Sequence, residues 1–323
     1  MRLRLIPYHY LLLILFCISP TFCLSQQSVF VGRHRALSVK GTALTDSHGD
    51  TVVLKGVSLG WHNWWPRFYN EKTIDWLVDD FQVNVVRAAV GVGVKGGYHD
   101  DPEQAFRCLY NVVDAAIKND VYVIVDWHSH GIYTDDAKEF FTKVATRYHG
   151  YSNIIYEIFN EPVDQPWTEI KAYSEEVISA IRSIDKNNLI LVGTPHWDQD
   201  VDIAADDPII GYDNIMYTLH FYAATHKQEL RKKADYALSK GLPLFVSECA
   251  GMEASGDGKV DIREWQRWQD WMSARKISWA VWSIADKNES CSMIVSPASP
   301  ASDWLESDLK EWGRITRTTL RNK

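Results

Sequence analysis

The sequence predicts a single α/β domain folded as a closed (β/α)8 barrel, the TIM-barrel architecture. Short apolar runs alternate with longer amphipathic stretches along almost the whole chain. The runs are apolar on both faces, which is typical of parallel strands that helices cover on both sides of a sheet. The 323 residues are too few for two large domains, but they suffice for one barrel of about 250 residues. Eight strand–helix units therefore favour a closed barrel over an open doubly wound sheet.

The individual elements follow from the same alternation. Eight apolar runs are expected to form the barrel strands: 52–59, 83–90, 121–127, 154–159, 189–194, 215–221, 244–247 and 277–284. The stretches between them have helical spacing. The expected helices are 71–81, 102–119, 134–148, 167–184, 227–240 and 262–275.

Two short segments precede the first barrel strand. Residues 36–39 and 51–53 flank a turn-forming stretch, 46–50. This pattern predicts a β-hairpin that closes the floor of the barrel. No Gly-x-Gly-x-x-Gly motif follows the first strand, which weakens the alternative of a dinucleotide-binding fold.

The first 23 residues are expected to form a secretory signal peptide. Arg2 and Arg4 provide a positive start, residues 11–16 an apolar middle, and Thr21-Phe22-Cys23 a cleavage zone. A membrane anchor is the alternative, but the apolar stretch is shorter than the ~20 residues that span a bilayer. The expectation is a mature domain, residues 24–323, that is secreted, soluble and not attached to the membrane.

Charge and composition limit the class of partner. The formal net charge of −8 argues against nucleic acid or an anionic membrane. The 14 Trp and 15 Tyr residues are expected mostly in the core, but aromatic side chains also stack on the apolar faces of sugar rings. A monomer with a carbohydrate partner is expected.

Three cysteines remain after signal cleavage, and they allow at most one disulfide. Cys249 and Cys291 follow neighbouring strands, so this pair is geometrically possible, with Cys108 left over. Two buried free thiols are an equally good alternative.

Polar and aromatic residues gather where the predicted strands end. In a (β/α)8 barrel the chemistry takes place at the C-terminal ends of the strands. Any one of these side chains has a structural explanation, but six strand ends that converge on one rim predict an active site. The residues at these ends are Arg87, Asp126, His128, His130, Asn160, Glu161, His220, Tyr222, Glu248 and Trp282.

Two of these residues are carboxylic acids on opposite sides of the barrel mouth. Glu161 and Glu248 each follow a buried apolar run, and facing carboxylates are what glycoside hydrolysis requires. A separation of ~5–5.5 Å gives retention and ~6.5–9.5 Å inversion, and the sequence does not supply this distance. Arg87 and Tyr222 are expected to hold Glu248 ionised as a nucleophile. Its charge is then expected to raise the pKa of Glu161, the acid, while Asn160 donates to a substrate hydroxyl.

These residues lie in stretches that together resemble glycoside hydrolase family 5, and within it the subfamily 2 endo-β-1,4-glucanases. The resemblance implies retaining, endo-acting hydrolysis of β-1,4-glucosidic bonds in cellulose and related β-glucans, without a cofactor. Glu161 is the implied acid/base and Glu248 the implied nucleophile. The matching stretches are Lys55-Gly56-Val57-Ser58, Asn84-Val85-Val86-Arg87, Val125-Asp126-Trp127-His128, Ile158-Phe159-Asn160-Glu161-Pro162, His220-Phe221-Tyr222, Val246-Ser247-Glu248 and Trp282-Ser283-Ile284-Ala285-Asp286-Lys287-Asn288-Glu289.

The same resemblance implies roles for other residues. Trp282 is the implied sugar platform beneath the scissile bond, and Trp64 stacks on a sugar unit further along the cleft. Lys287 and Glu289 resemble a pair that binds glucose hydroxyls, which favours glucan over mannan. Asn288-Glu289-Ser290 is an N-glycosylation sequon. A glycan on Asn288 would crowd Lys287 and Glu289, so Asn288 is expected to be unmodified. The implied supporting residues are Arg87, His128, Asn160, His220 and Tyr222.

Three alternatives remain. The first is a mannanase or a xyloglucan or mixed-linkage glucanase of the same family. The second is a catalytically inactive carbohydrate-binding protein, although such a protein is expected to have lost one of the two carboxylates. The third is a metal hydrolase that uses Asp126, His128, His130 and His220. Barrel hydrolases of that kind carry the His-x-His pair on the first strand, so no metal is expected here.

Overall fold

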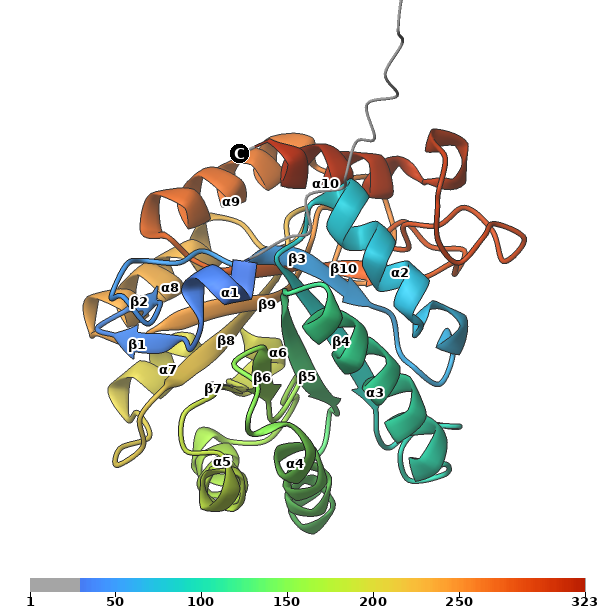
Figure 1. Cartoon of the computed structure of the whole chain (residues 1–323). Helices are drawn as coiled ribbons and strands as arrows, with labels where there is room; N and C mark the ends of the chain where they lie inside the picture. The colour runs from blue at the N-terminus through green and yellow to red at the C-terminus, as the bar shows by residue number, and fades with distance from the viewer. Residues whose placement is uncertain (1–29, 323) are drawn as a thin grey trace, which may run out of the picture.

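The chain folds into a closed barrel of parallel strands, which confirms the predicted (β/α)8 architecture. A computed structural model describes residues 30–322, and Figure 1 shows helices surrounding the barrel. In the described part of the chain, neighbouring strands follow the order β10-β3-β4-β5-β6-β7-β8-β9. Their bounds are β3 Lys55–Leu59, β4 Val85–Gly91, β5 Tyr122–His128, β6 Ile154–Glu157, β7 Leu189–Val192, β8 Ile215–Tyr222, β9 Leu244–Ala250 and β10 Trp279–Ile284.

Successive side chains of each strand point alternately into the barrel and towards the helices. The inward positions form an apolar layer near the N-terminal ends of the strands, where Val85, Ile124 and Ile155 pack in one cluster. Two residues further along the same strands are Arg87, Asp126 and Glu157, all fully buried and charged. Because every second side chain points inward, a layer of polar residues lies above the apolar floor of the barrel. This polar layer supports the site.

The predicted hairpin forms, but with a different turn. β1 Ser38–Lys40 pairs antiparallel with β2 Ala43–Thr45, so residues 41–42 make the tight turn. The stretch 46–50 is a second turn, because the Asp46 carboxylate accepts from two backbone amides within it. Pairing between the two predicted segments is reduced to one isolated bridge, Thr45 to Thr51. The expected position on the barrel floor is confirmed by Leu37 and Leu44, which pack in the cluster with Val85.

All six predicted helices are present. Asp101 caps α3 by accepting from the backbone N–H of Gln104 at 2.9 Å, and Pro102 occupies the favoured first position. Within residues 30–322, four further α-helices were not predicted: α1 Phe30–His34, α6 Pro195–Asp198, α7 Val201–Asp206 and α10 Glu311–Arg321. The predicted helices are α2 Glu71–Trp76, extended by a π-helical turn at Leu77–Phe81, α3 Pro102–Lys118, α4 Thr134–Tyr148, α5 Trp167–Ile184, α8 Gln228–Ser239 and α9 Ile262–Arg275.

Cys249 and Cys291 are free thiols, as is Cys108, so the disulfide alternative is wrong. The Sγ of Cys249 instead contacts the carbonyl of Ala280 at 3.4 Å. The predicted signal peptide, residues 1–23, lies outside the described residues. Within residues 30–322, no helix combines the length and the apolar character needed to cross a membrane.

Candidate active site

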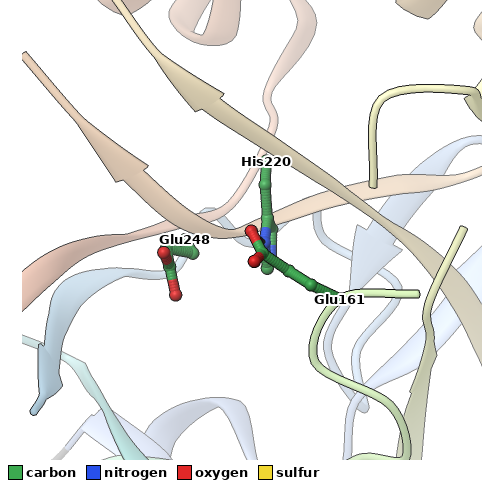
Figure 2. Close-up of side chains that lie close together, drawn as sticks. All are labelled: Glu161, His220 and Glu248. Carbon is green, nitrogen blue, oxygen red and sulfur yellow. Dashed lines mark hydrogen bonds and ion pairs between the residues drawn. The ribbon is translucent and has the colours of Figure 1, made fainter. Parts of the chain in front are cut away.

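The two predicted carboxylates face each other at the barrel mouth, with His220 beside them (Figure 2). Glu248 lies on β9, Glu161 lies in the segment after β6, and His220 lies on β8. One donor atom from each of the three side chains lies within 4.8 Å of the other two. This close approach of one oxygen from each carboxylate is compatible with the retaining arrangement, in which the carboxyl groups are about 5–5.5 Å apart.

Arg87 joins the charged residues of the polar layer. Its Nη1 donates to Glu248 Oε2 at 3.0 Å and its Nε to Glu157 Oε2 at 2.7 Å. Its Nη2 donates to Asn160 Oδ1 at 2.6 Å and lies 3.0 Å from Asp126 Oδ2. A planar guanidinium with five N–H donors is suited to such a shared position. One buried cation therefore orients the nucleophile candidate and the amide beside the acid candidate.

Glu248 makes the predicted contacts, but the net direction of its pKa differs from the prediction. Tyr222 donates its hydroxyl to Glu248 Oε1 at 2.7 Å, and Arg87 holds Oε2. Burial and the charge of Glu161 raise the pKa of Glu248, and Arg87, His220 and Tyr222 only partly oppose this. The expected contacts are formed, but they do not lower the pKa of Glu248 below its usual value.

The predicted rise in the pKa of Glu161 is wrong. His220 Nδ1 lies 3.0 Å from Glu161 Oε1, and His130 Nε2 lies 3.3 Å from Oε2. Burial acts to raise the pKa of Glu161, but the hydrogen bonds with His130 and His220 outweigh it and lower the pKa to about 2. Glu161 is therefore ionised in the free protein. If Glu161 is the acid, it needs a proton before it can donate one, and its two histidine partners are the neighbouring groups that carry protons.

A cavity on one side of the carboxylate pair contains the predicted sugar-binding residues. Trp282 stacks parallel to His128, with ring centroids 5.2 Å apart. Lys287 Nζ pairs with Glu289 Oε2 at 2.5 Å in the lining of the same cavity. The aromatic, basic and acidic lining provides both stacking surface and hydrogen-bonding groups. The lining includes Trp61, Trp64, His128, His130, Glu161, Tyr222, Glu248, Trp282, Lys287 and Glu289.

The loop that carries Lys287 and Glu289 is held from two sides. Lys310, just before α10, donates its Nζ to the carbonyls of Lys287 and Glu289 at 2.5 and 3.0 Å. The Ser290 hydroxyl donates to Asp257 Oδ1 at 2.8 Å. The ion pair is therefore presented on a supported loop rather than a free one.

A second cavity lies on the other side of Glu161. It shares Glu161, Tyr222 and Ala254 with the first cavity. The remaining lining residues are His196, Trp197, Gln199, His220 and His226. Because the two cavities meet at the acid candidate, a chain can extend on both sides of the reacting position.

The structure brings every predicted site residue to this rim. Arg87, Asn160, His220 and Tyr222 contact one of the two candidate carboxylates or each other. The ligand set expected for a metal hydrolase is not assembled in the described residues. His128 Nδ1 contacts Asp126 at 2.6 Å, but the trio of close ligand-type atoms comprises Glu161, His220 and Glu248 instead.

Three residues that contact the site were not predicted from the sequence. Glu157 pairs with Arg87, Ser247 Oγ lies 2.9 Å from His220 Nε2, and Asp198 Oδ2 lies 3.3 Å from the same nitrogen. Glu157 had a usable signal, because it lies two positions after the inward-facing Ile155. Asp198 had none, since its segment was not predicted to be ordered around the site.

Comparison with known proteins supports this geometry. The profile of the cellulase family, glycosyl hydrolase family 5, matches residues 45–288. An endoglucanase of Clostridium saccharobutylicum is 43% identical over 291 residues, which are 88% of this chain and 64% of that protein. Endoglucanase Z of Dickeya dadantii is 47% identical over 243 residues, or 73% of this chain and 57% of that protein. The chain thus spans less than two thirds of either relative.

Solved structures show the same fold. A structure from Cytophaga hutchinsonii has a TM-score of 0.89 and 45% identity, and the match covers 91% of this chain and 97% of that one. The catalytic domain of a Thermobifida fusca endoglucanase has a TM-score of 0.85 and 33% identity, with 90% and 98% covered. From its barrel, its paired carboxylates and these matches, the chain belongs to the cellulase family, glycosyl hydrolase family 5.

Proposed function

We propose that the protein is a retaining endo-β-1,4-glucanase that hydrolyses cellulose and related β-glucans. The observation that carries this proposal is the close approach of Glu161 and Glu248 at the meeting point of two cavities. Relatives named endoglucanase support the polymer, and the Thermobifida fusca enzyme has been solved with cellotetraose. We assign the chain to subfamily 2 from the motifs around these residues.

The proposed reaction is a double displacement. Glu248 attacks the anomeric carbon while Glu161 gives a proton to the departing glycosidic oxygen, which leaves a glycosyl–enzyme ester. Glu161 then removes a proton from water as the water attacks that ester, and the carboxylate of Glu248 is released. Arg87 and Tyr222, which hold the two oxygens of Glu248, orient it for attack and stabilise it when it departs.

The two cavities bind the chain on either side of the bond. Trp282 and Trp64 provide aromatic faces for glucose rings, and Lys287 and Glu289 bind ring hydroxyls. This polar pair favours glucan over mannan. No group other than these side chains is needed for the proposed chemistry, so we propose a cofactor-independent enzyme.

We further propose that the protein is secreted and acts as a monomer. The support is the signal-like pattern of residues 1–23 and the net charge of −8. A secreted enzyme meets an insoluble polymer outside the cell, which agrees with the substrate proposed here.

The substitutions Glu248→Gln and Glu161→Gln test the assignment. Loss of the nucleophile is expected to lower kcat on carboxymethylcellulose by at least ~10³-fold. Loss of the acid/base is expected to lower it by ~10²–10⁴-fold. Glu103→Gln is the control, because this glutamate is 90% exposed on α3, where it pairs with Arg107. Near-normal turnover in Glu248→Gln would contradict the mechanism.

Substrate choice is tested by following reducing ends and viscosity on carboxymethylcellulose, mannan and xylan in parallel. A rapid loss of viscosity on carboxymethylcellulose alone is expected. Release of sugar from mannan alone would contradict the proposed substrate, but not the proposed roles of the two carboxylates. Proton NMR of the first product is expected to show the β-anomer, and an α-anomer would contradict retention.

A further inference from the structure

Asp198, at the end of α6, is a buried carboxylate that the proposed mechanism does not use. Its side chain is 0% exposed. Its Oδ1 accepts from the backbone N–H of Thr194 at 2.5 Å. Within residues 30–322 its Oδ2 has no hydrogen-bond partner, and it lies 3.3 Å from His220 Nε2. A buried carboxylate loses its hydration and requires a counterion, and His220 is the cationic group placed to be that counterion.

An unusual backbone turn places Asp198 at this position. His196, Trp197 and Asp198 have φ values of 59°, 55° and 57°, a left-handed run that residues other than glycine rarely adopt. Such conformations persist only where the surrounding structure imposes them. Trp197 N donates to the carbonyl of Pro162 at 2.8 Å. The turn is therefore tied to the segment that carries Glu161.

His220 has a partner on each ring nitrogen. Nδ1 faces Glu161 Oε1 at 3.0 Å, and Nε2 faces Ser247 Oγ at 2.9 Å and Asp198 Oδ2 at 3.3 Å. A neutral imidazole carries a proton on only one nitrogen, whereas the charged ring donates from both. Because a carboxylate lies on each side of His220, the doubly protonated imidazole can donate a hydrogen from both of its nitrogens towards these partners.

The charges around His220 favour this state. Burial acts to lower the pKa of His220, but Asp198 and the hydrogen bonds with Glu157 and Glu161 raise it well above its usual value. Burial, together with the charges of Glu161 and Glu157, raises the pKa of Asp198 well above its usual value, and His220 and the Thr194 amide only partly oppose this. The titratable groups that act on this pair or on which His220 acts are Asp126, His128, Glu157, Glu161 and Glu248.

We propose that Asp198 is a positioning residue that keeps His220 positively charged, with the Nδ1–H of His220 donated to Glu161. The effect on catalysis rests on the proposed function, whereas the Asp198–His220 ion pair does not. The charged ring holds Glu161 ionised in the free enzyme and stores a proton one hydrogen bond away. Breaking the N–H bond at Nδ1 and forming an O–H bond at Glu161 Oε1 gives neutral imidazole and the carboxylic acid, without uptake of a proton from solvent.

The test is Asp198→Asn in the full chain, because an amide keeps an acceptor for Thr194 and removes the charge. Nitrogen-15 NMR of labelled histidine follows the protonation of His220, whose signals are assigned by their loss in His220→Gln. The matched control is Asp200→Asn, since Asp200 lies on the same segment but pairs with Lys233 at 2.5 Å and His196 at 3.6 Å. Rates of cellotetraose hydrolysis are measured over the same pH range.

We expect His220 to be doubly protonated at pH 6 in the wild type. In Asp198→Asn, its titration is expected to move down by about one pH unit or more, because a unit charge at this distance is lost. The alkaline limb of kcat/KM is expected to move in the same direction, and Asp200→Asn to leave both unchanged.

A neutral His220 at pH 6 in the wild type would overturn the proposal, and this measurement does not depend on whether Asp198→Asn folds. Equal shifts in Asp198→Asn and Asp200→Asn would overturn it too. A shifted titration with an unmoved alkaline limb would refute the positioning role. A charged His220 in a protein that does not cleave β-glucans would support the ion pair and contradict the proposed function instead.

Discussion

Among single residues, Arg87 is the one on which most of the buried charge depends. It is fully buried and contacts the carboxylates of Asp126, Glu157 and Glu248. Removing one partner of a buried ion pair leaves an uncompensated charge, which typically costs about 3–5 kcal/mol. Here a single truncation leaves three carboxylates without their shared cation.

We predict that Arg87→Met lowers the free energy of unfolding by about 3–5 kcal/mol, measured by urea denaturation at pH 7. The control is Arg147→Met, because Arg147 lies on the surface and its ion pair with Asp114 spans 3.3 Å. Such exposed pairs contribute about 0–1 kcal/mol. Equal losses in the two variants would show that Arg87 does not have the electrostatic role assigned to it.

The identities of the two facing carboxylates were predictable from the sequence, but their protonation was not. Glu161 and Glu248 were predictable because each ends an apolar run, and in a barrel all such ends share one rim. The pKa of Glu161 depends instead on His130 and His220 lying 3.3 and 3.0 Å from its oxygens. Such distances arise from the packing of separate strands, so no local pattern encodes them.

At the scale of elements, the floor hairpin illustrates the same limit. Its position under the barrel was predicted, but the pairing was wrong because the Asp46 side chain forms its own turn. β3 begins at Lys55 rather than at residue 52, since Val52 and Leu54 belong to the floor cluster. The short helix α6 was missed because it contains a left-handed turn, which helical periodicity does not reveal.

We predict that Leu44→Ala, on β2, lowers the free energy of unfolding by about 2–4 kcal/mol, because Leu44 is buried against the barrel strands. The kcat on carboxymethylcellulose is expected to stay within about twofold of the wild type, since chemistry takes place at the opposite end of the strands. Urea denaturation and initial rates measure the two effects.

Leu305→Ala is the control for Leu44→Ala, because Leu305 is a large exposed apolar residue outside this cluster. In Leu305→Ala the free energy of unfolding is expected to change by less than about 0.5 kcal/mol. A large fall in kcat in folded Leu44→Ala would show that the floor and the rim are coupled.

At the scale of the whole molecule, stability is expected to fall as the solution becomes acidic. His62 is fully buried, and its Nδ1 accepts from the backbone N–H of Gly91 at 3.0 Å. Its Nε2 has no hydrogen-bond partner in the part of the chain that the structure describes. Burial lowers the pKa of His62 to about 4, against about 6.5 in the unfolded chain. Between these values the unfolded chain binds a proton that the folded protein does not, so stability decreases as the pH falls from 6.5 to 4.

We predict that His62→Asn reduces this acid-dependent loss by about 3 kcal/mol, because an amide retains an acceptor for Gly91 and does not titrate. Urea midpoints at intervals between pH 7 and pH 4 measure the slope. His48→Asn is the control, since His48 is exposed in the turn near the floor. An unchanged slope in His62→Asn would show that other groups cause the acid sensitivity.

The network around Arg87 also determines where the enzyme can be redesigned. Because one guanidinium pairs with Asp126, Glu157 and Glu248, a change of charge at any of these residues is expected to alter both the stability of the fold and the position of the proposed nucleophile, Glu248. His130 contacts Glu161 from the rim, with its side chain 42% exposed. An engineer who wishes to move the working pH of this enzyme should therefore vary His130 and leave the partners of Arg87 untouched.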